Sequence, residues 1–132
     1  MEAGVQVELV DGPLGVQPPG AAPPAGGRCG AVLAFTGVVR GLEGGRPLRA
    51  LRYEGYEPMT GRLLHGLAAA VVAEFGLHAA RVEHSLGEVA VGEASFRLTL
   101  AGAHRPETLA ATAAFIDRMK ADVPLWKVPV FA

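Results

Sequence analysis

The sequence predicts an α+β fold, with a mainly antiparallel sheet covered on one side by two main helices. Three observations support this class: short segments of alternating apolar residues, two longer segments with apolar residues at helical spacing, and Gly- or Pro-containing breaks between them. The predicted order is strands, helix, strands, helix. Residues 1–132 are expected to form a single domain with a sizeable core.

The first group of predicted strands lies before residue 55. Val5 to Val10 alternate as in a strand, and Asp11-Gly12-Pro13 follows with a turn signature. The Pro- and Gly-rich connector at residues 18–27 cannot hold a helix or a central strand, so we expect an irregular segment there. Ala31 to Phe35 is an apolar run typical of a buried strand. Leu48 to Glu54 predicts a strand that returns as in a hairpin.

The first predicted helix follows these strands. Thr60 is the expected N-cap, and Gly76 is expected to end the helix. Gly66 should weaken the helix by about 1 kcal/mol relative to Ala, unless a neighbouring backbone packs closely against it. Helical spacing predicts a core stripe formed by Leu63, Leu67, Val71 and Phe75.

Two further strands are predicted at residues 81–86 and 94–100, with a wide turn at residues 87–93 between them. His84 lies on the apolar face of the first of these strands. A histidine in that position is more often a hydrogen-bonded core residue than a catalyst. Phe35 and Phe96 are also expected in the core.

The second predicted helix carries the densest group of reactive side chains. Pro106 suits the first helical position, and Pro124 is expected to end the helix. His104 and Arg105 stand directly before it. Its predicted apolar stripe is Leu109, Ala113 and Ile116, with Lys120 at the edge, and Trp126-Lys127 comes after a short extended piece. We expect Pro124 and Trp126 to line a pocket near the lysines.

The junction at His104 and Arg105 indicates an anion site. Free backbone N–H groups and the helix dipole favour negative charge at the start of a helix. Arg40, in the glycine-containing turn after the 31–35 strand, is expected to converge on the same place, and such a group of residues suits a phosphate. The turn is not a Walker loop, since the Gly-x-x-x-x-Gly-Lys-Ser/Thr spacing is absent.

Lys120 and Lys127 have two interpretations. Each lies close to apolar or aromatic residues, where loss of hydration disfavours the charged form and suits a lysine that moves protons. A lysine in a last helical turn, however, more often faces water and complements the helix dipole. If both belong to the anion site, that site could bind an anionic substrate and shuttle protons without a Ser or Cys nucleophile.

Composition excludes several classes of function. A formal net charge of -1 gives no support for a nucleic-acid or acidic-membrane surface. The single Cys29 excludes an internal disulfide and a Cys-x-x-Cys zinc site, and the four histidines lack metal-binding spacing, so we expect no metal and no cofactor. The N-terminus is acidic and no apolar run approaches ~18 residues, which predicts a soluble protein of the cytoplasm.

Five motifs together resemble the large, catalytic subunit of molybdopterin synthase. They are FTGVVRG at Phe35, YEGYEPMT at Tyr53, the His84-x-x-Gly87-Glu88 turn, GAHR at Gly102 and KADVPLWK at Lys120. The resemblance covers roughly Val5 to Lys127. Two departures accompany it: PPGAAPPAGGR stands where the family commonly has a helix, and family members usually continue past the second lysine with further charged residues.

The resemblance implies a fold, partners and a reaction. The fold is α/β hammerhead-like, and the large subunit forms a homodimer that binds one small ubiquitin-like subunit at each end, giving a heterotetramer. The small subunit is a sulfur carrier whose C-terminal Gly-Gly tail, carried as a thiocarboxylate, enters a pocket of the large subunit. Its sulfur is transferred to cyclic pyranopterin monophosphate, and two transfers make the dithiolene of molybdopterin.

The resemblance also implies roles for individual residues. Lys120 and Lys127 match the two pocket lysines, and Arg40, His104 and Arg105 match residues that bind the substrate phosphate and anchor the pocket. Two other interpretations remain open at this point. One is a non-catalytic module that captures the C-terminal tail of a ubiquitin-like protein. The other is a sulfur carrier that uses Cys29 as a persulfide, which requires an accessible thiol of low pKa.

Overall fold

The computed structural model describes residues 4–15 and 26–132. In the first half of the chain it contains β1 (Gly4–Asp11), η1 (Gly26–Arg28), β2 (Ala31–Val38), β3 (Leu42–Glu43), β4 (Arg46–Gly55) and α1 (Met59–Phe75). In the second half it contains β5 (Ala79–Ala90), β6 (Ala94–Gly102), α2 (Arg105–Asp122) and β7 (Leu125–Phe131). This is the predicted α+β class.

The strands form one sheet in the order β2-β6-β5-β4-β3, with β1 paired to β5 and β7 paired to β4. β1 and β5 run parallel, and the other pairs are antiparallel. The long strand β5 links two parts of the sheet, because residues 79–84 pair with β6 and residues 87–90 pair with β4. The cavity described below lies where these two parts meet.

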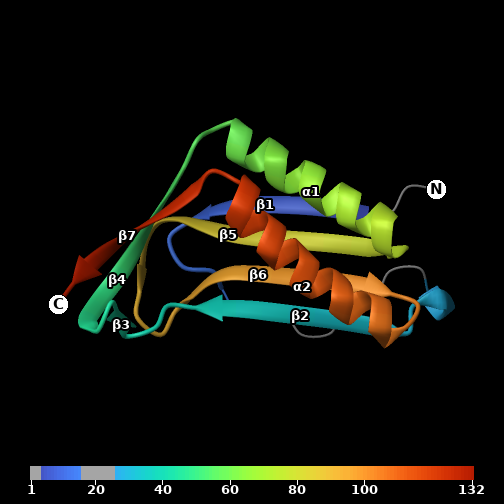
Figure 1. The fold of residues 1–132 in the computed structure, drawn as a ribbon, viewed down its shortest axis with the longest axis horizontal. Helices are drawn as coiled ribbons and strands as arrows, with labels where there is room; N and C mark the ends of the chain where they lie inside the picture. Colours follow the sequence, from blue (N-terminus) through green and yellow to red (C-terminus); the bar gives the residue numbers. More distant parts are fainter. Residues whose placement is uncertain (1–3, 16–25) are drawn as a thin grey trace.

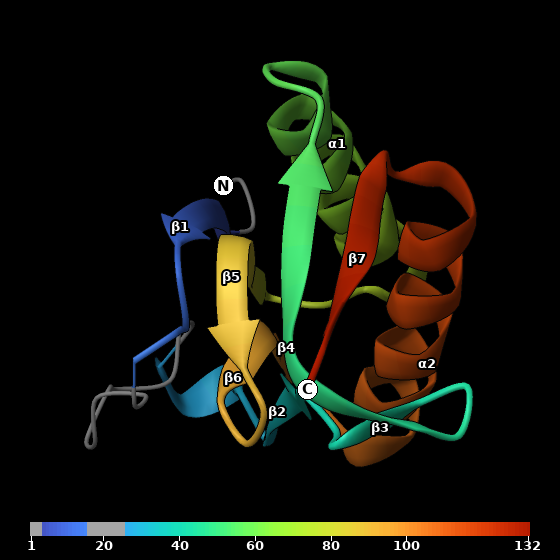
Figure 2. The same cartoon turned by 90° about the vertical axis from the view of Figure 1, so that its left-hand side faces the viewer.

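Both helices lie against the same face of the sheet (Figures 1 and 2). Leu64 and Val71 of α1, Phe115 of α2, and Leu98 and Leu100 of β6 are fully buried between these layers. A second, smaller cluster forms toward the β4 end of the sheet, from Val39, Leu48, Leu51 and Val89. Burial of these apolar side chains holds the helices in place over the sheet.

The predicted wide turn at residues 87–93 is wrong, because β5 continues to Ala90 and only Val91-Gly92-Glu93 turns. Gly87 adopts a positive φ of 82° inside the strand. A Cβ atom at Gly87 would lie 2.8 Å from the Asp11 Oδ1 atom. The glycine therefore reflects the close approach of the end of β1, which a single sequence does not reveal.

The strand predicted at Ala31 to Phe35 exists, but it is not a buried strand. Among the described strands β2 pairs only with β6, so it forms an edge of the sheet. Phe35 is 41% exposed, which corrects its expected place in the core, whereas Phe96 is buried as predicted. Most of the 18–27 connector lies outside the described residues; its last two glycines, Gly26 and Gly27, belong to η1.

Both helices exist as predicted, and Gly76 ends α1 in the left-handed conformation. Thr60 is not the N-cap, because α1 begins at Met59 and the Thr60 hydroxyl instead accepts the Tyr56 N–H at 2.7 Å and donates to the Pro124 carbonyl at 2.8 Å. Of the residues predicted for the core stripes, Leu67, Phe75 and Ile116 are partly buried against the core, and Leu63 is 42% exposed. The buried stripes include only Val71 of the predicted residues. They are Thr60, Leu64, Ala68, Val71 and Val72 in α1, and Thr108, Ala111, Thr112, Phe115 and Met119 in α2.

The shift in α2 has a local explanation. Thr108 and Thr112 are buried although they are polar, because their hydroxyls donate to the carbonyls of His104 and Thr108 at 2.8 and 2.9 Å. A threonine satisfied in this way by its own helix can face the core. Leu109, which the periodicity placed in the core, is 52% exposed.

The strand β7 was not predicted beyond a short extended piece near Pro124. It pairs with β4 in antiparallel register, with Lys127 opposite Tyr53 and Pro129 opposite Leu51. A proline within a strand is tolerated at a sheet edge, where its missing N–H is not needed.

Within the described parts of the chain, no helix is long and apolar enough to cross a membrane.

Candidate active site

A cavity of about 490 Å³ opens where α2 and β7 approach the ends of β2, β3 and β4. Side chains from seven elements and one loop line it, so the site depends on the whole arrangement of the fold. Those with polar or aromatic groups are Phe35, Arg40, Glu43, Tyr53, His84, Ser95, Phe96, Lys120 and Lys127.

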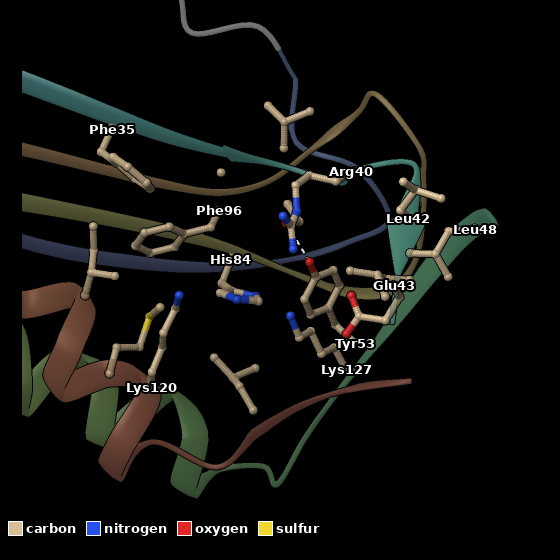
Figure 3. Close-up of a pocket in the computed structure, with 17 residues that line it drawn as sticks. Phe35, Arg40, Leu42, Glu43, Leu48, Tyr53, His84, Phe96, Lys120 and Lys127 are labelled. Atoms are coloured by element: carbon tan, nitrogen blue, oxygen red, sulfur yellow. Dashed lines mark hydrogen bonds between the residues drawn. The ribbon is translucent and has the colours of Figure 1, made fainter. Parts of the chain in front are cut away.

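Three cationic side chains converge in this cavity from distant parts of the sequence. Arg40 follows β2, Lys120 lies in the last turn of α2, and Lys127 lies on β7. Figure 3 shows all three directed toward the space around His84. Such a concentration of positive charge in a concave, partly apolar site favours anionic ligands.

The two lysines share the cavity but are exposed in the isolated chain. Apolar side chains next to them, from Ile116, Met119 and Leu125, also line the cavity. The expected loss of hydration is thus not present in the chain alone, although the apolar surroundings are. Contrary to expectation, Pro124 and Trp126 do not line the cavity, because alternation along β7 places Leu125 and Lys127 on that side.

The deep part of the cavity is formed by hydrogen-bonded polar residues packed among aromatic rings. Tyr53 and Ser95 share a hydrogen bond between their hydroxyl groups at 2.9 Å. His84 is 5% exposed, and its Nδ1 atom lies 2.8 Å from the Ser85 carbonyl oxygen. Burial lowers the pKa of His84 below its usual range, partly opposed by that hydrogen bond.

His104 and Arg105 do not meet Arg40 within one chain. They stand at the first turn of α2, while Lys120 is in its last turn, and a helix of 18 residues spans roughly 27 Å. Figure 1 shows the first turn of α2 near one end of the molecule and its last turn near the middle, beside the start of β7. The His104 side chain is 79% exposed, with its Nδ1 atom 3.5 Å from Glu107 Oε2. Both residues are therefore presented outward, away from the cavity of their own chain.

Cys29 also lies away from the cavity, just before β2, whereas the cavity is lined by residues from Phe35 onward. It is partly buried, and its thiol lies 3.7 Å from the Ala31 carbonyl oxygen. This position gives no support to a persulfide at the site. Among residues 4–15 and 26–132, no three His, Cys, Asp or Glu side chains gather in a way that could hold a metal ion.

Comparison with known protein families decides the relationship. The family model described as MoaE protein matches residues 16–122. The chain belongs to the MoaE protein family. This is the family whose catalytic subunits the five sequence motifs resemble, so the resemblance is confirmed.

Curated relatives of this MoaE-family chain carry the name molybdopterin synthase catalytic subunit. The one from Arabidopsis thaliana is 36% identical over 104 residues, which cover 79% of this chain and 52% of the relative. The one from Homo sapiens is 34% identical over 103 residues, covering 78% of this chain and 55% of the relative. The chain thus spans about half the length of these relatives.

Solved structures share the fold of the MoaE-family chain. Molybdopterin synthase from Staphylococcus aureus superimposes with a TM-score of 0.80 at 24% identity, covering 95% of this chain and 90% of that one. A complex of subunits 1 and 2 of molybdopterin-converting factor from Helicobacter pylori gives 0.72 at 21% identity, covering 96% and 89%. These similarities confirm the predicted architecture.

Sequence reasoning missed several residues of the cavity in this MoaE-family chain. Phe35 was assigned to the core, and Glu43 was not among the predicted site residues. His84 is buried and hydrogen-bonded as expected, but its place in the cavity wall was not predicted. His84 pairs with Phe96 at the last position where β5 pairs with β6. From Gly87 onward β5 pairs with β4 instead, and the cavity forms where the two partner strands diverge. No periodicity in one strand reveals such a divergence.

Proposed function

We propose that this chain is the catalytic subunit of a molybdopterin synthase. It transfers sulfur from the thiocarboxylated C-terminus of a small ubiquitin-like subunit to cyclic pyranopterin monophosphate, which makes the dithiolene of molybdopterin. The observation that carries the proposal is the convergence of Arg40, Lys120 and Lys127 in one cavity of a MoaE-family fold. The relatives named molybdopterin synthase catalytic subunit support it.

The chemistry of the substrates matches this cavity. The sulfur donor is an anionic thiocarboxylate and the acceptor carries a phosphate, so both need positive charge nearby. Arg40 is suited to the phosphate because its guanidinium donates two hydrogen bonds in a fixed plane. Apolar and aromatic walls from Phe35, Phe96 and Leu125 suit the planar part of the acceptor.

The two lysines take different roles in the proposed reaction. Lys120 stands beside the thiocarboxylate carbonyl, where it stabilises negative charge as sulfur leaves or acts as a general acid/base. Lys127 assists at the pterin. Docking of the carrier tail covers both side chains, which supplies the loss of hydration that the isolated chain lacks.

His104 and Arg105 enter this proposal through a second copy of the chain. They are exposed and stand roughly a whole helix away from the cavity of their own chain. In a homodimer, they complete the cavity of the partner and bind the substrate phosphate there. With one small subunit at each end, the assembly is a heterotetramer.

We place the assembly in the cytoplasm, because a chain with Cys29 as its single cysteine needs no oxidising compartment.

The test mixes the purified chain with a thiocarboxylated ubiquitin-like partner and cyclic pyranopterin monophosphate, and follows dithiolene formation by mass spectrometry. Lys120→Ala should lose about 3 to 5 kcal/mol of transition-state stabilisation. Lys120→Arg keeps the charge but cannot give up a proton, so it separates charge stabilisation from acid/base catalysis. Arg49→Ala, an exposed cation on β4 outside the cavity, should retain full activity.

Two outcomes would contradict the proposal. Turnover by Lys120→Ala at the rate of the unmodified chain would remove the lysine from the reaction. A tight complex with the partner that gives no product would favour the alternative, in which the cationic cavity only captures the C-terminal carboxylate of a ubiquitin-like protein.

A further inference from the structure

His84 is a buried, titratable residue of the cavity that the proposed reaction does not use. It lies on β5, is 5% exposed, and lines the cavity together with the three cations. Its ring packs between Tyr53, whose ring centroid is 5.1 Å away in an edge-on arrangement, and Phe96, at 5.7 Å. The ring is therefore held in one orientation.

The hydrogen bond at Nδ1 fixes which ring nitrogen carries the proton. The Ser85 carbonyl oxygen, 2.8 Å away, can only accept, so Nδ1 must donate. Burial disfavours the charged ring and lowers the pKa of His84, so the ring is neutral at neutral pH. In a neutral imidazole with a proton on Nδ1, the Nε2 atom is a hydrogen-bond acceptor. Among the described residues, no hydrogen bond engages Nε2.

Most polar groups of this cavity are either charged or already hydrogen-bonded to each other, as are the hydroxyls of Tyr53 and Ser95. Arg40, Lys120 and Lys127 present only donors, and they suit a ligand that brings acceptors, such as phosphate. Glu43 is the carboxylate of the lining and lies on β3. Tyr53 and Phe96 flank His84 and line the same cavity, so the wall around His84 is aromatic and suits a planar group that brings an N–H donor.

We propose that His84 is a specificity-determining residue that accepts, through Nε2, a hydrogen bond from an N–H group of the pterin ring of the substrate. This inference rests on the proposed function. A pterin carries ring and exocyclic N–H donors at one end, whereas its phosphate carries only acceptors. The cavity therefore orients the substrate, with the phosphate bound by Arg40 and the donor edge of the pterin bound by Nε2 of His84. The aromatic surroundings favour a planar ring over the Gly-Gly tail of the carrier.

Two substitutions separate the two ring nitrogens. His84→Asn keeps a donor near the position of Nδ1 for the Ser85 carbonyl and removes the acceptor at Nε2. His84→Gln is longer and places an amide oxygen near the position of Nε2. Both remove the ring from between Tyr53 and Phe96, so both carry a similar packing defect. Thermal unfolding verifies that each variant is folded.

The measurement is the affinity of the assembled synthase for cyclic pyranopterin monophosphate, by anaerobic calorimetry, together with competitive inhibition of turnover by inorganic phosphate. His84→Asn should bind the pterin substrate about 3- to 10-fold more weakly, as expected for loss of one neutral hydrogen bond. His84→Gln should recover most of that affinity. Inhibition by phosphate should be the same in all three proteins, because phosphate is bound by the Arg40 guanidinium and does not depend on the acceptor at Nε2 of His84.

Three results would overturn the inference. Equal loss of affinity in both variants, or a parallel loss of phosphate inhibition, would show a structural role. A fall in kcat with unchanged affinity for the pterin would assign His84 to proton transfer or to the carrier tail instead. If the unmodified chain neither binds nor converts the pterin, the proposed function itself fails, which is a distinct outcome.

Discussion

Burial of His84 links one side chain to the pH dependence of stability. Its pKa is lowered in the folded chain, while the unfolded chain has the ordinary value near 6.5. Below about pH 6.5 the unfolded state therefore binds a proton that the folded state does not, and the free energy of unfolding decreases as the pH falls.

The expected slope is up to about 1.4 kcal/mol per pH unit, from about pH 6.5 down to the folded pKa of His84. Urea denaturation at several pH values between about 7.5 and 5.5 measures it for the unmodified chain and for His84→Asn. The variant should lack this component. Parallel pH profiles would show that His84 does not titrate differently in the two states, since the other three histidines are common to both proteins.

At the scale of single residues, the sequence identified the cations of the cavity better than its uncharged part. Arg40, Lys120 and Lys127 could be selected because charged residues near glycine turns, prolines and aromatics are visible in the sequence. His84 could not, because its alternation on an apolar strand is the same for a core residue and for a cavity wall. What distinguishes the two is the divergence of β4 and β6, which depends on distant residues.

Two glycines, one within α1 and one packed against α2, differ in the space available for a larger side chain. Gly66 is exposed on α1, and a Cβ atom there would meet no atom within 4 Å, so close packing does not explain it. Gly102 is buried at the end of β6, where a Cβ atom would lie 2.5 Å from Thr108 Oγ1 and 3.0 Å from Leu77 Cδ2. The two sites should respond to alanine in opposite directions.

Gly66→Ala should stabilise the chain by about 0.5 to 1 kcal/mol, because alanine has the higher helix propensity. Gly102→Ala should destabilise it by about 1 to 3 kcal/mol, because α2 must shift away from the sheet. Chemical denaturation of both variants provides the comparison. A stabilising effect at Gly102 would show that the contact between β6 and the first turns of α2 is looser than described.

Among the elements, existence was easier to predict than orientation. Both helices and most strands followed from periodicity and from glycine and proline positions. The buried faces of the helices differ from the predicted ones because three threonines face inward with their hydroxyls hydrogen-bonded. Thr108 and Thr112 donate to carbonyls four residues earlier, and Thr60 donates to the Pro124 carbonyl. The strand β7 was missed because Pro129 argues against a strand unless its place at an edge is known.

At the scale of the whole molecule, the contribution of His104 and Arg105 depends on the assembly of two chains. If they complete the cavity of a second copy, two inactive variants should complement each other when mixed. Lys120→Ala chains supply an intact Arg105, and Arg105→Ala chains supply an intact Lys120. In a mixed dimer, one of the two cavities then has both residues, while the other lacks both.

Equal amounts of the two variants, allowed to exchange subunits, should therefore regain about a quarter of the activity of the unmodified protein, because half of the dimers are mixed and each has one intact cavity. The dithiolene assay measures the recovery, and each variant assayed alone is the control. If no activity is recovered although subunit exchange is proven, then either Arg105 acts in the cavity of its own chain or it takes no part in the reaction.

The order of the strands also has a consequence for synthesis of the chain. Gly4 of β1 stands opposite Ala79, and Ala31 of β2 stands opposite Gly102, so the first two strands find their neighbours only after most of the polypeptide has been made. Pairings so remote along the chain are slow to form, typically within milliseconds to seconds for such topologies. A ribosome paused before β5 would leave both strands without partners, and these are the segments from which aggregation of a nascent chain would begin.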